Sequence, residues 1–90
     1  MELEDIRKRL DELDKELVVI LAKRISLIPG IAEYKKKHKI PRYQPEREKE
    51  IIEEKRKLAK ELNLDQGLVE DIFKRIIQES HKIEKDIIGE

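Results

Sequence analysis

The sequence predicts an all-α fold: a three-helix subunit with a long first helix, paired with a second copy as an intertwined homodimer. Three observations support this prediction. Apolar residues recur at helical spacing along nearly the whole chain. The prolines and most other helix-breaking residues gather in a few short segments, and no segment shows the strict alternation of a strand. Finally, 90 residues are too few to build a deep core from a single copy.

The first helix is predicted to run from the N-terminus to near His38. Its apolar residues recur at alternating steps of three and four: Leu3, Ile6, Leu10, Leu13, Leu17, Ile20, Leu27, Ile31 and Tyr34. At 1.5 Å per residue such a helix is more than ~50 Å long. Two shorter helices of the same subunit cannot cover this stripe along its full length. Pairing of two long helices in a homodimer covers it economically.

Pro29 and Gly30 lie inside this predicted helix, although both residues disfavour helix interiors. Pro29 removes the hydrogen bond to the carbonyl of Ile25. We favour a kinked but continuous helix, because a full break leaves Lys35 poorly fixed relative to the preceding turn. The alternative is that a new helix simply starts after Ser26.

Two shorter helices are predicted in the rest of the chain. The segment KHKIPRYQPERE contains Pro41 and Pro45, and it forms the first loop. Pro45 suits the first position of the second helix, and Asp65 suits the N-cap of the third. The predicted buried faces comprise Ile51, Ile52, Leu58 and Leu62 on the second helix, and Val69, Ile72, Phe73, Ile76, Ile77, Ile83 and Ile87 on the third.

Composition excludes several functions. Lys plus Arg and Asp plus Glu each number 21, so neither sign of charge favours a nucleic-acid or membrane partner. There is no Cys, and the isolated His38 and His81 form no ligand-spaced pair, so no metal site is expected. Without a membrane-length apolar run or a signal peptide, we expect a cytoplasmic protein. Few Asn and Gln beside abundant Lys, Glu and Ile predict a heat-adapted source.

Polar residues interrupt the apolar faces at a few positions, of which Arg24 and Lys35 are the most unusual. A charge that faces a core is costly unless it is paired. One interpretation is an internal salt bridge, for instance from Arg24 or Lys35 to Glu48 or Glu84. The other is a cationic pocket for a small dianion. Helical spacing alone leaves both open. The complete set of interrupting residues is Arg24, Lys35, Arg47, Glu48, Ser80 and Glu84.

The order of four segments resembles the all-helical class of chorismate mutases. These segments read IRKRLDELDKELVVILAKR, IAEYKK, PEREKEII and IIQESHKIEKD. The similarity covers essentially the whole chain, and we expect residues 1–90 to form a single domain. The resemblance implies an intertwined homodimer of three-helix subunits. It also implies conversion of chorismate to prephenate, in phenylalanine and tyrosine biosynthesis, without any cofactor or metal.

The resemblance also implies a role for particular residues. It places Arg7 and Arg24 on the two carboxylates of chorismate, with Ser80 assisting. Lys35 is expected near the ether oxygen, and Glu48 at the ring hydroxyl. The implied catalytic residues are Lys35, Glu84 and Arg24, and the implied substrate-binding residues are Arg7, Arg24, Lys35, Gln44, Arg47, Glu48, Ser80 and Glu84.

Two positions depart from the family pattern. Gln44 stands where many members have Asp, which matters little if the loop contributes a backbone N–H. Glu84 stands where many members have Gln, so the protonation state of the site is left open. Arg47 is expected either to contact substrate or to organise Glu48 and the loop; the sequence does not separate these roles.

Spacing along the first helix predicts shared sites. Arg7 and Arg24 lie ~25 Å apart along one helix, too far to hold one small molecule. If both bind the same substrate, Arg7 comes from the other subunit. Two other functions remain open: removal of pyruvate from isochorismate on the same fold, and a non-enzymatic helical dimer for protein interaction.

Overall fold

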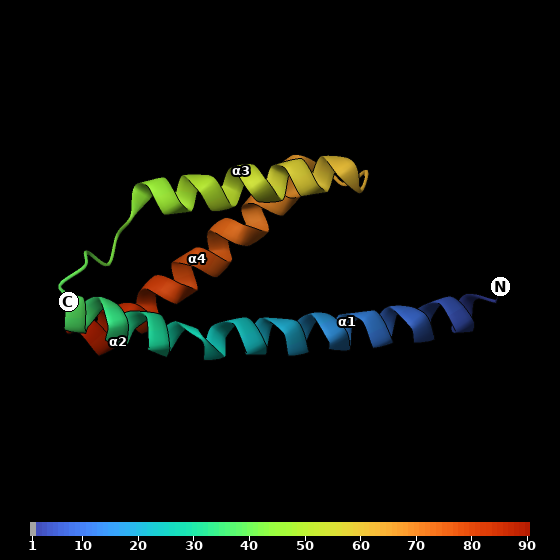
Figure 1. Cartoon of the computed structure of the whole chain (residues 1–90). Helices are drawn as coiled ribbons and strands as arrows, with labels where there is room; N and C mark the ends of the chain where they lie inside the picture. Colours follow the sequence, from blue (N-terminus) through green and yellow to red (C-terminus); the bar gives the residue numbers. More distant parts are fainter. Residues whose placement is uncertain (1) are drawn as a thin grey trace.

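The computed structural model describes residues 2–90. It contains four helices: α1 (Leu3–Ser26), α2 (Ile28–His38), α3 (Pro45–Glu61) and α4 (Gln66–Ile88). Helix α2 follows α1 end to end, and the two together form one long arm (Figure 1). Helix α4 runs back from the end of α3 to reach α2. The predicted all-α, three-helix arrangement is therefore confirmed, with the first helix divided in two.

The first helix divides at Leu27, so the kinked but continuous helix that we favoured is wrong, and the alternative of a new helix after Ser26 is correct. Pro29 occupies the second position of α2 and has no N–H to give to the preceding turn. The Leu27 N–H instead donates to the Arg24 carbonyl oxygen at 3.2 Å, which tightens the last turn of α1. Leu27 itself keeps right-handed helical angles, with φ −86° and ψ −17°. The arm consequently continues in the same general direction despite the break (Figure 1).

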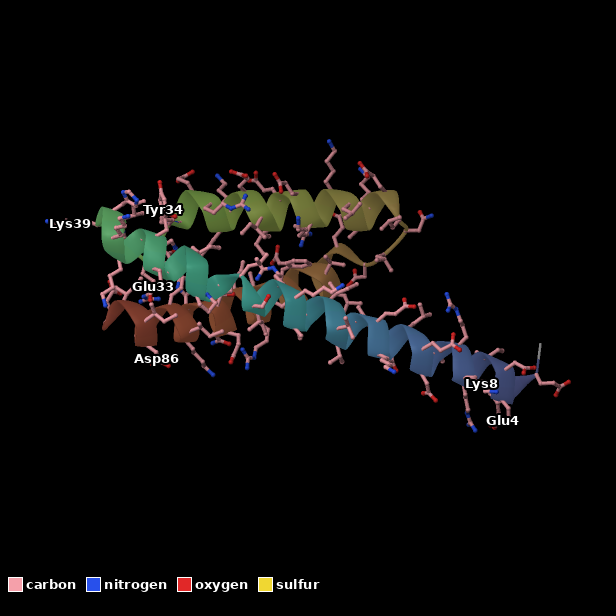
Figure 2. All side chains as sticks on the ribbon, turned by 60° about the horizontal axis from the view of Figure 1, so that its bottom comes forward. Glu4, Lys8, Glu33, Tyr34, Lys39 and Asp86 are labelled. Carbon is pink, nitrogen blue, oxygen red and sulfur yellow. The ribbon has the colours of Figure 1, made fainter. Side chains whose placement is uncertain are left out.

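Helix α1 extends well beyond the other helices. In Figure 2, Glu4 and Lys8 mark its free end, whereas Glu33 and Lys39 mark the opposite end of the arm. No residue of α1 is buried in the single chain. Its apolar stripe is at least one third exposed throughout, from 39% at Leu13 to 66% at Leu17. An apolar stripe of this length is the kind of surface that a partner helix covers.

The turns between helices follow the sequence signals closely. Lys39 adopts a left-handed conformation with φ 56° after the last turn of α2, and the chain then passes into the loop that precedes α3. Pro45 begins α3, as predicted. Asn63, with φ 58°, ends that helix, and the next N–H, that of Leu64, returns to the Ala59 carbonyl oxygen at 2.8 Å. Asp65 caps α4, as predicted, by accepting the Leu68 N–H at 2.9 Å.

The core is small and lies where α4 packs against α2 and α3. Four apolar residues are buried, namely Ile28, Ala32, Ala59 and Ile77. Three of the predicted core positions on the shorter helices are instead about half exposed or more in the single chain: Leu58 (49%) and Leu62 (61%) on α3, and Ile72 (49%) on α4. Two polar residues of α4, Ser80 and Glu84, are also buried.

A surface ion-pair cluster also joins α3 to α4. Glu70 of α4 binds Arg56 of α3 and Lys74 of its own helix, each at 3.0 Å. The hydrogen bond from Lys74, followed by the charge of that residue and by Arg56, lowers the pKa of Glu70 below its ordinary value of 4.5. Between residues 2 and 90, no helix combines the length and the apolar character that crossing a membrane requires.

Candidate active site

A cavity of about 360 Å³ lies where the end of α1, α2, the loop 39–44, α3 and α4 meet. Its wall combines a few apolar side chains with a group of charged and polar ones. The polar lining residues are Arg24, Lys35, Arg42, Gln44, Arg47, Glu48, Ser80, His81 and Glu84. The structure thus brings together every site residue expected from the sequence except Arg7. This volume is in the range of small-molecule sites.

Lys35 and Glu84 form a buried ion pair across the cavity wall. Lys35 Nζ lies 2.8 Å from Glu84 Oε1, and the side chains are only 13% and 7% exposed. Lys35 Nζ also donates to the Arg42 carbonyl oxygen at 2.9 Å. Because an ammonium group has three N–H donors, these two contacts leave one free. One of the internal salt bridges considered from the sequence is therefore present, and it lines the cavity.

Arg24 is bound less firmly than Lys35. Its Nη1 donates to Ser80 Oγ at 3.4 Å, a long hydrogen bond, and Ser80 Oγ donates in turn to the Ile76 carbonyl oxygen at 3.1 Å. Among residues 2–90, Arg24 makes no ion pair with a carboxylate. The side chain is half-buried at the cavity, so its guanidinium is available to an anion that enters.

Glu48 belongs to a second polar group on the same wall. Its Oε2 lies 3.0 Å from His81 Nε2, and His81 Nδ1 lies 2.7 Å from Arg42 Nη1. Arg42 is further held by Glu90, whose Oε2 is 2.8 Å from Arg42 Nε. Sequence reasoning missed Arg42 and His81 as site residues, since His81 was considered only as a metal ligand.

A signal for His81 was nevertheless present in the helical spacing. Ile77, Ser80, His81 and Glu84 are separated by steps of three, one and three, which places all four on one face of α4. Because Ser80 and Glu84 were assigned to the site, the same face includes His81. Arg42 carries no such signal, because it lies in an irregular loop whose path depends on tertiary contacts.

Gln44 and Arg47 lie at the start of α3. Gln44 is the N-cap, and its carbonyl oxygen accepts the N–H groups of Arg47 and Glu48 at 3.1 and 3.2 Å. The Arg47 side chain is 58% exposed and pairs with Glu50 at 2.7 Å. In the single chain Arg47 is therefore directed to its own helix surface, and it does not bind Glu48.

Arg7 lies far from this cavity. It is located in the exposed part of α1, where its side chain is 63% exposed and its Nη1 lies 3.3 Å from Glu4 Oε1. Helix α1 is unbroken between Arg7 and Arg24, so the ~25 Å separation along its axis holds. The cavity of a chain cannot receive Arg7 of that same chain.

The electrostatics of the cavity favour an anion. Four cations line it, Arg24, Lys35, Arg42 and Arg47, against the carboxylates of Glu48 and Glu84. Three of these cations, Arg24, Lys35 and Arg42, are partly buried, and a partly buried cation holds a small anion more strongly than the same group does in water. The fold and the site together define an all-helical protein with a polar, cation-rich cavity suited to a small carboxylate ligand.

Comparison with known proteins identifies the family. The sequence pattern of the family described as chorismate mutase type II matches residues 6–85. The chain is 39% identical over 88 residues to a chorismate mutase of Methanocaldococcus jannaschii, covering 98% of this chain and 89% of that protein. The chain therefore belongs to the chorismate mutase type II family.

Two other relatives differ in length or in name. The chain is 38% identical over 85 residues to the T-protein of Enterobacter agglomerans, covering 94% of this chain but only 23% of that protein. It therefore spans about a quarter of the length of that relative. It is also 32% identical over 83 residues to a 4-amino-4-deoxychorismate mutase of Streptomyces venezuelae, covering 92% of this chain and 81% of that protein.

Proposed function

We propose that this chain is a chorismate mutase, which converts chorismate to prephenate. The observation that carries the proposal is the cavity itself, which gathers Arg24, Lys35, Glu48, Ser80 and Glu84 from separate elements of a chain in this family. Chorismate is a small dianion with a ring hydroxyl and an ether oxygen. The cavity offers cationic donors for the charges and a carboxylate acceptor for the hydroxyl.

The reaction is a concerted rearrangement within one molecule. The carbon–oxygen bond of the ether breaks while a new carbon–carbon bond forms between the side chain and the ring, so atoms and electrons balance without a second reactant. No nucleophile or general base is required. The protein accelerates such a step by holding the reactive conformer and by stabilising negative charge that develops on the ether oxygen.

Arg24 and Ser80 are proposed to bind one carboxylate of the substrate. The guanidinium of Arg24 lines the cavity, and within residues 2–90 its one polar side-chain contact is the long hydrogen bond to Ser80. Its planar fork can bind a carboxylate through two parallel hydrogen bonds. Ser80 provides a second contact at the same end of the cavity when its hydroxyl turns from the Ile76 carbonyl oxygen and donates to the carboxylate.

Lys35 is proposed to bind the ether oxygen. Two of its three N–H donors are already directed to Glu84 and to the Arg42 carbonyl, which restricts the ammonium group to one position. The third donor is free for the oxygen on which negative charge grows. A donor that is held in place before reaction does not need to reorganise in the transition state.

Glu84 is proposed to act in its protonated form. An ionised carboxylate at the ether oxygen repels the developing negative charge, whereas a protonated one donates a hydrogen bond as an amide does. In this form the carbonyl oxygen of Glu84 still accepts the hydrogen bond from Lys35 at 2.8 Å, and the O–H of Glu84 is available to the ether oxygen.

Glu48 and Gln44 are proposed to bind the ring end of the substrate. Glu48 accepts the ring hydroxyl, and Gln44 contributes to the loop that closes this end of the cavity. Arg47 lines the cavity and makes no contact with Glu48 among residues 2–90, so we propose that it contacts the substrate after leaving Glu50.

A homodimer with shared sites completes the proposal. The exposed apolar stripe of α1 is suited to a second copy of this chain, and Arg7 lies on the part of α1 that projects beyond the other helices. In such a dimer Arg7 of one subunit reaches the cavity of the other and binds the second carboxylate.

The test is an absorbance assay of chorismate consumption by the purified chain, with the product identified by chromatography against prephenate. Steady conversion to prephenate supports the proposal. Conversion of isochorismate to pyruvate and salicylate, without loss of chorismate, contradicts it and favours the lyase. The name of the Streptomyces venezuelae relative makes the 4-amino analogue of chorismate a second substrate to assay in parallel.

Binding of a substrate-like ligand distinguishes an enzyme from a non-enzymatic dimer. A dicarboxylate that mimics the transition state raises the melting temperature of a chain with a true site, because it binds only the folded state. An unchanged melting temperature at millimolar ligand indicates that Arg24 and Lys35 serve only the internal structure.

A further inference from the structure

His81 links a loop arginine to Glu48 across three elements of the fold. Arg42 from the loop 39–44 lies 2.7 Å from His81 Nδ1, and His81 Nε2 on α4 lies 3.0 Å from Glu48 Oε2 on α3. All three side chains line the cavity. The three residues are separated widely in sequence and meet only because the loop passes beside both helices.

The partners of the imidazole determine its tautomer. A guanidinium group has donors only, so Arg42 Nη1 donates and His81 Nδ1 accepts. The proton of the neutral ring then lies on Nε2, which donates to the Glu48 carboxylate. A proton on Nδ1 would point at the guanidinium, so Nδ1 could no longer accept the hydrogen bond from Arg42. In the neutral ring, Arg42 therefore selects the Nε2–H tautomer of His81.

The imidazole is also held in place by its surroundings. The Tyr43 ring stacks on it, with centroids 6.0 Å apart and an angle of 28° between planes. Arg42 is itself held by Glu90, whose Oε2 accepts the Arg42 Nε–H at 2.8 Å. The side chains of His81 and Arg42 are each 20% exposed. These contacts make His81 a firmly oriented donor.

We propose that His81 is a positioning residue that orients Glu48 toward the substrate, with Arg42 selecting the tautomer that allows it to donate. The inference rests on the proposed function, in which Glu48 accepts the ring hydroxyl. His81 Nε2–H donates to Oε2 of Glu48, so Oε1 stays available to accept the ring hydroxyl of the substrate. An oriented carboxylate binds the ring in one position, whereas an unrestrained one must lose rotational freedom on binding.

The first test compares three substitutions in the full chain. His81→Leu removes the donor and is expected to lower kcat/KM about tenfold to a hundredfold, the range for a lost hydrogen bond to a charged group. His81→Gln places an amide N–H near the Nε2 position and is expected to restore activity to within about threefold. His38→Leu serves as the matched control, because His38 is an exposed histidine of α2 that contacts Tyr34.

The second test asks whether the effect passes through Glu48. In a Glu48→Ala background, His81→Leu is expected to cause no further loss, because there is no carboxylate left to orient. The measurement is a double-mutant cycle on kcat/KM and on affinity for the transition-state-analogue dicarboxylate. An equal loss in both backgrounds, or wild-type activity of folded His81→Leu, overturns the inference.

The third test does not depend on the reaction. The ¹⁵N chemical shifts of His81 in the full chain are expected to report protonation at Nε2 only, and Arg42→Ala is expected to remove this selection. A ring protonated at Nδ1 only overturns the proposal. If the wild-type chain leaves chorismate unchanged, the proposed function fails. The spectra still show which tautomer of His81 is present.

Discussion

Lys35 Nζ lies 2.8 Å from Glu84 Oε1, and this buried pair joins α2 to α4 at the cavity. Removing one partner of a buried ion pair leaves an uncompensated charge, so substitutions here affect both stability and activity. Glu84→Gln keeps the shape of the side chain and an oxygen acceptor for Lys35, but its amide cannot ionise. It therefore isolates the effect of the charge on Glu84.

Glu84→Gln is expected to flatten the pH dependence of kcat/KM. An ionised Glu84 carboxylate repels the negative charge that develops on the ether oxygen, whereas a protonated one donates a hydrogen bond to that oxygen. The amide cannot ionise, so the variant keeps its activity on the alkaline side. The measurement is a profile of kcat/KM against pH for both proteins. Superimposable profiles contradict the assignment of Glu84 to the ether oxygen.

Arg24→Ala is expected to lower kcat/KM at least about a hundredfold while the chain stays folded. In the described part of the chain, the side chain of Arg24 makes a single long hydrogen bond, to Ser80, so its loss disturbs the structure little and removes a donor to the substrate carboxylate. The matched control is Arg75→Ala, since Arg75 is an exposed arginine on α4 that pairs with Glu79. Full activity in a folded Arg24→Ala protein rejects the site assignment.

Mixing Arg7→Ala and Arg24→Ala subunits is expected to restore activity that neither variant has alone. If sites are shared, each mixed dimer holds one intact site, and random exchange recovers roughly a quarter of the wild-type activity. The measurement is chorismate consumption after refolding the two variants together. Subunit exchange is confirmed separately with a tagged copy; exchange without recovery shows that each site belongs to one chain.

Glu70→Gln is expected to reduce stability at neutral pH, by an amount that shrinks in acid. The folded-state pKa of Glu70 is lowered, chiefly by the hydrogen bond from Lys74, so its contribution is complete above the ordinary value of 4.5. The contribution is lost as pH falls from that value through the lower folded-state pKa. The measurement is the urea midpoint of both proteins between pH 7 and pH 3, at one protein concentration.

The matched control for this comparison is Glu61→Gln, a substitution at an exposed position near the end of α3. Its effect on the midpoint is expected to stay close to constant over the same range. A difference between wild type and Glu70→Gln that grows as pH falls reverses the sign of the linkage and contradicts the prediction.

Helix ends were the most readily predicted feature of the fold. Pro45 begins α3 and Asp65 caps α4, as the sequence indicated. Both signals are local: proline suits the first turn because its missing N–H has no partner there, and aspartate accepts a free N–H of the first turn. The break at Leu27 was harder to predict, because Pro29 permits either a kink or a new helix.

Several site residues were predicted because they interrupt an apolar face or match a family motif. Arg24 and Lys35 stood out in this way, and both line the cavity. Spacing did not decide which carboxylate pairs with which cation. The structure pairs Lys35 with Glu84, and it directs Glu48 to His81 instead.

The sequence by itself determined the all-helical class, most helix boundaries and the face of each helix that carries polar groups, because these depend on residues within one or two turns of each other. Only the tertiary structure decided which groups meet. The path of loop 39–44 brings the Arg42 carbonyl to Lys35 and the Arg42 guanidinium to His81. Such contacts join residues far apart in the chain, and their geometry depends on how α4 packs against α2 and α3, which no local pattern encodes.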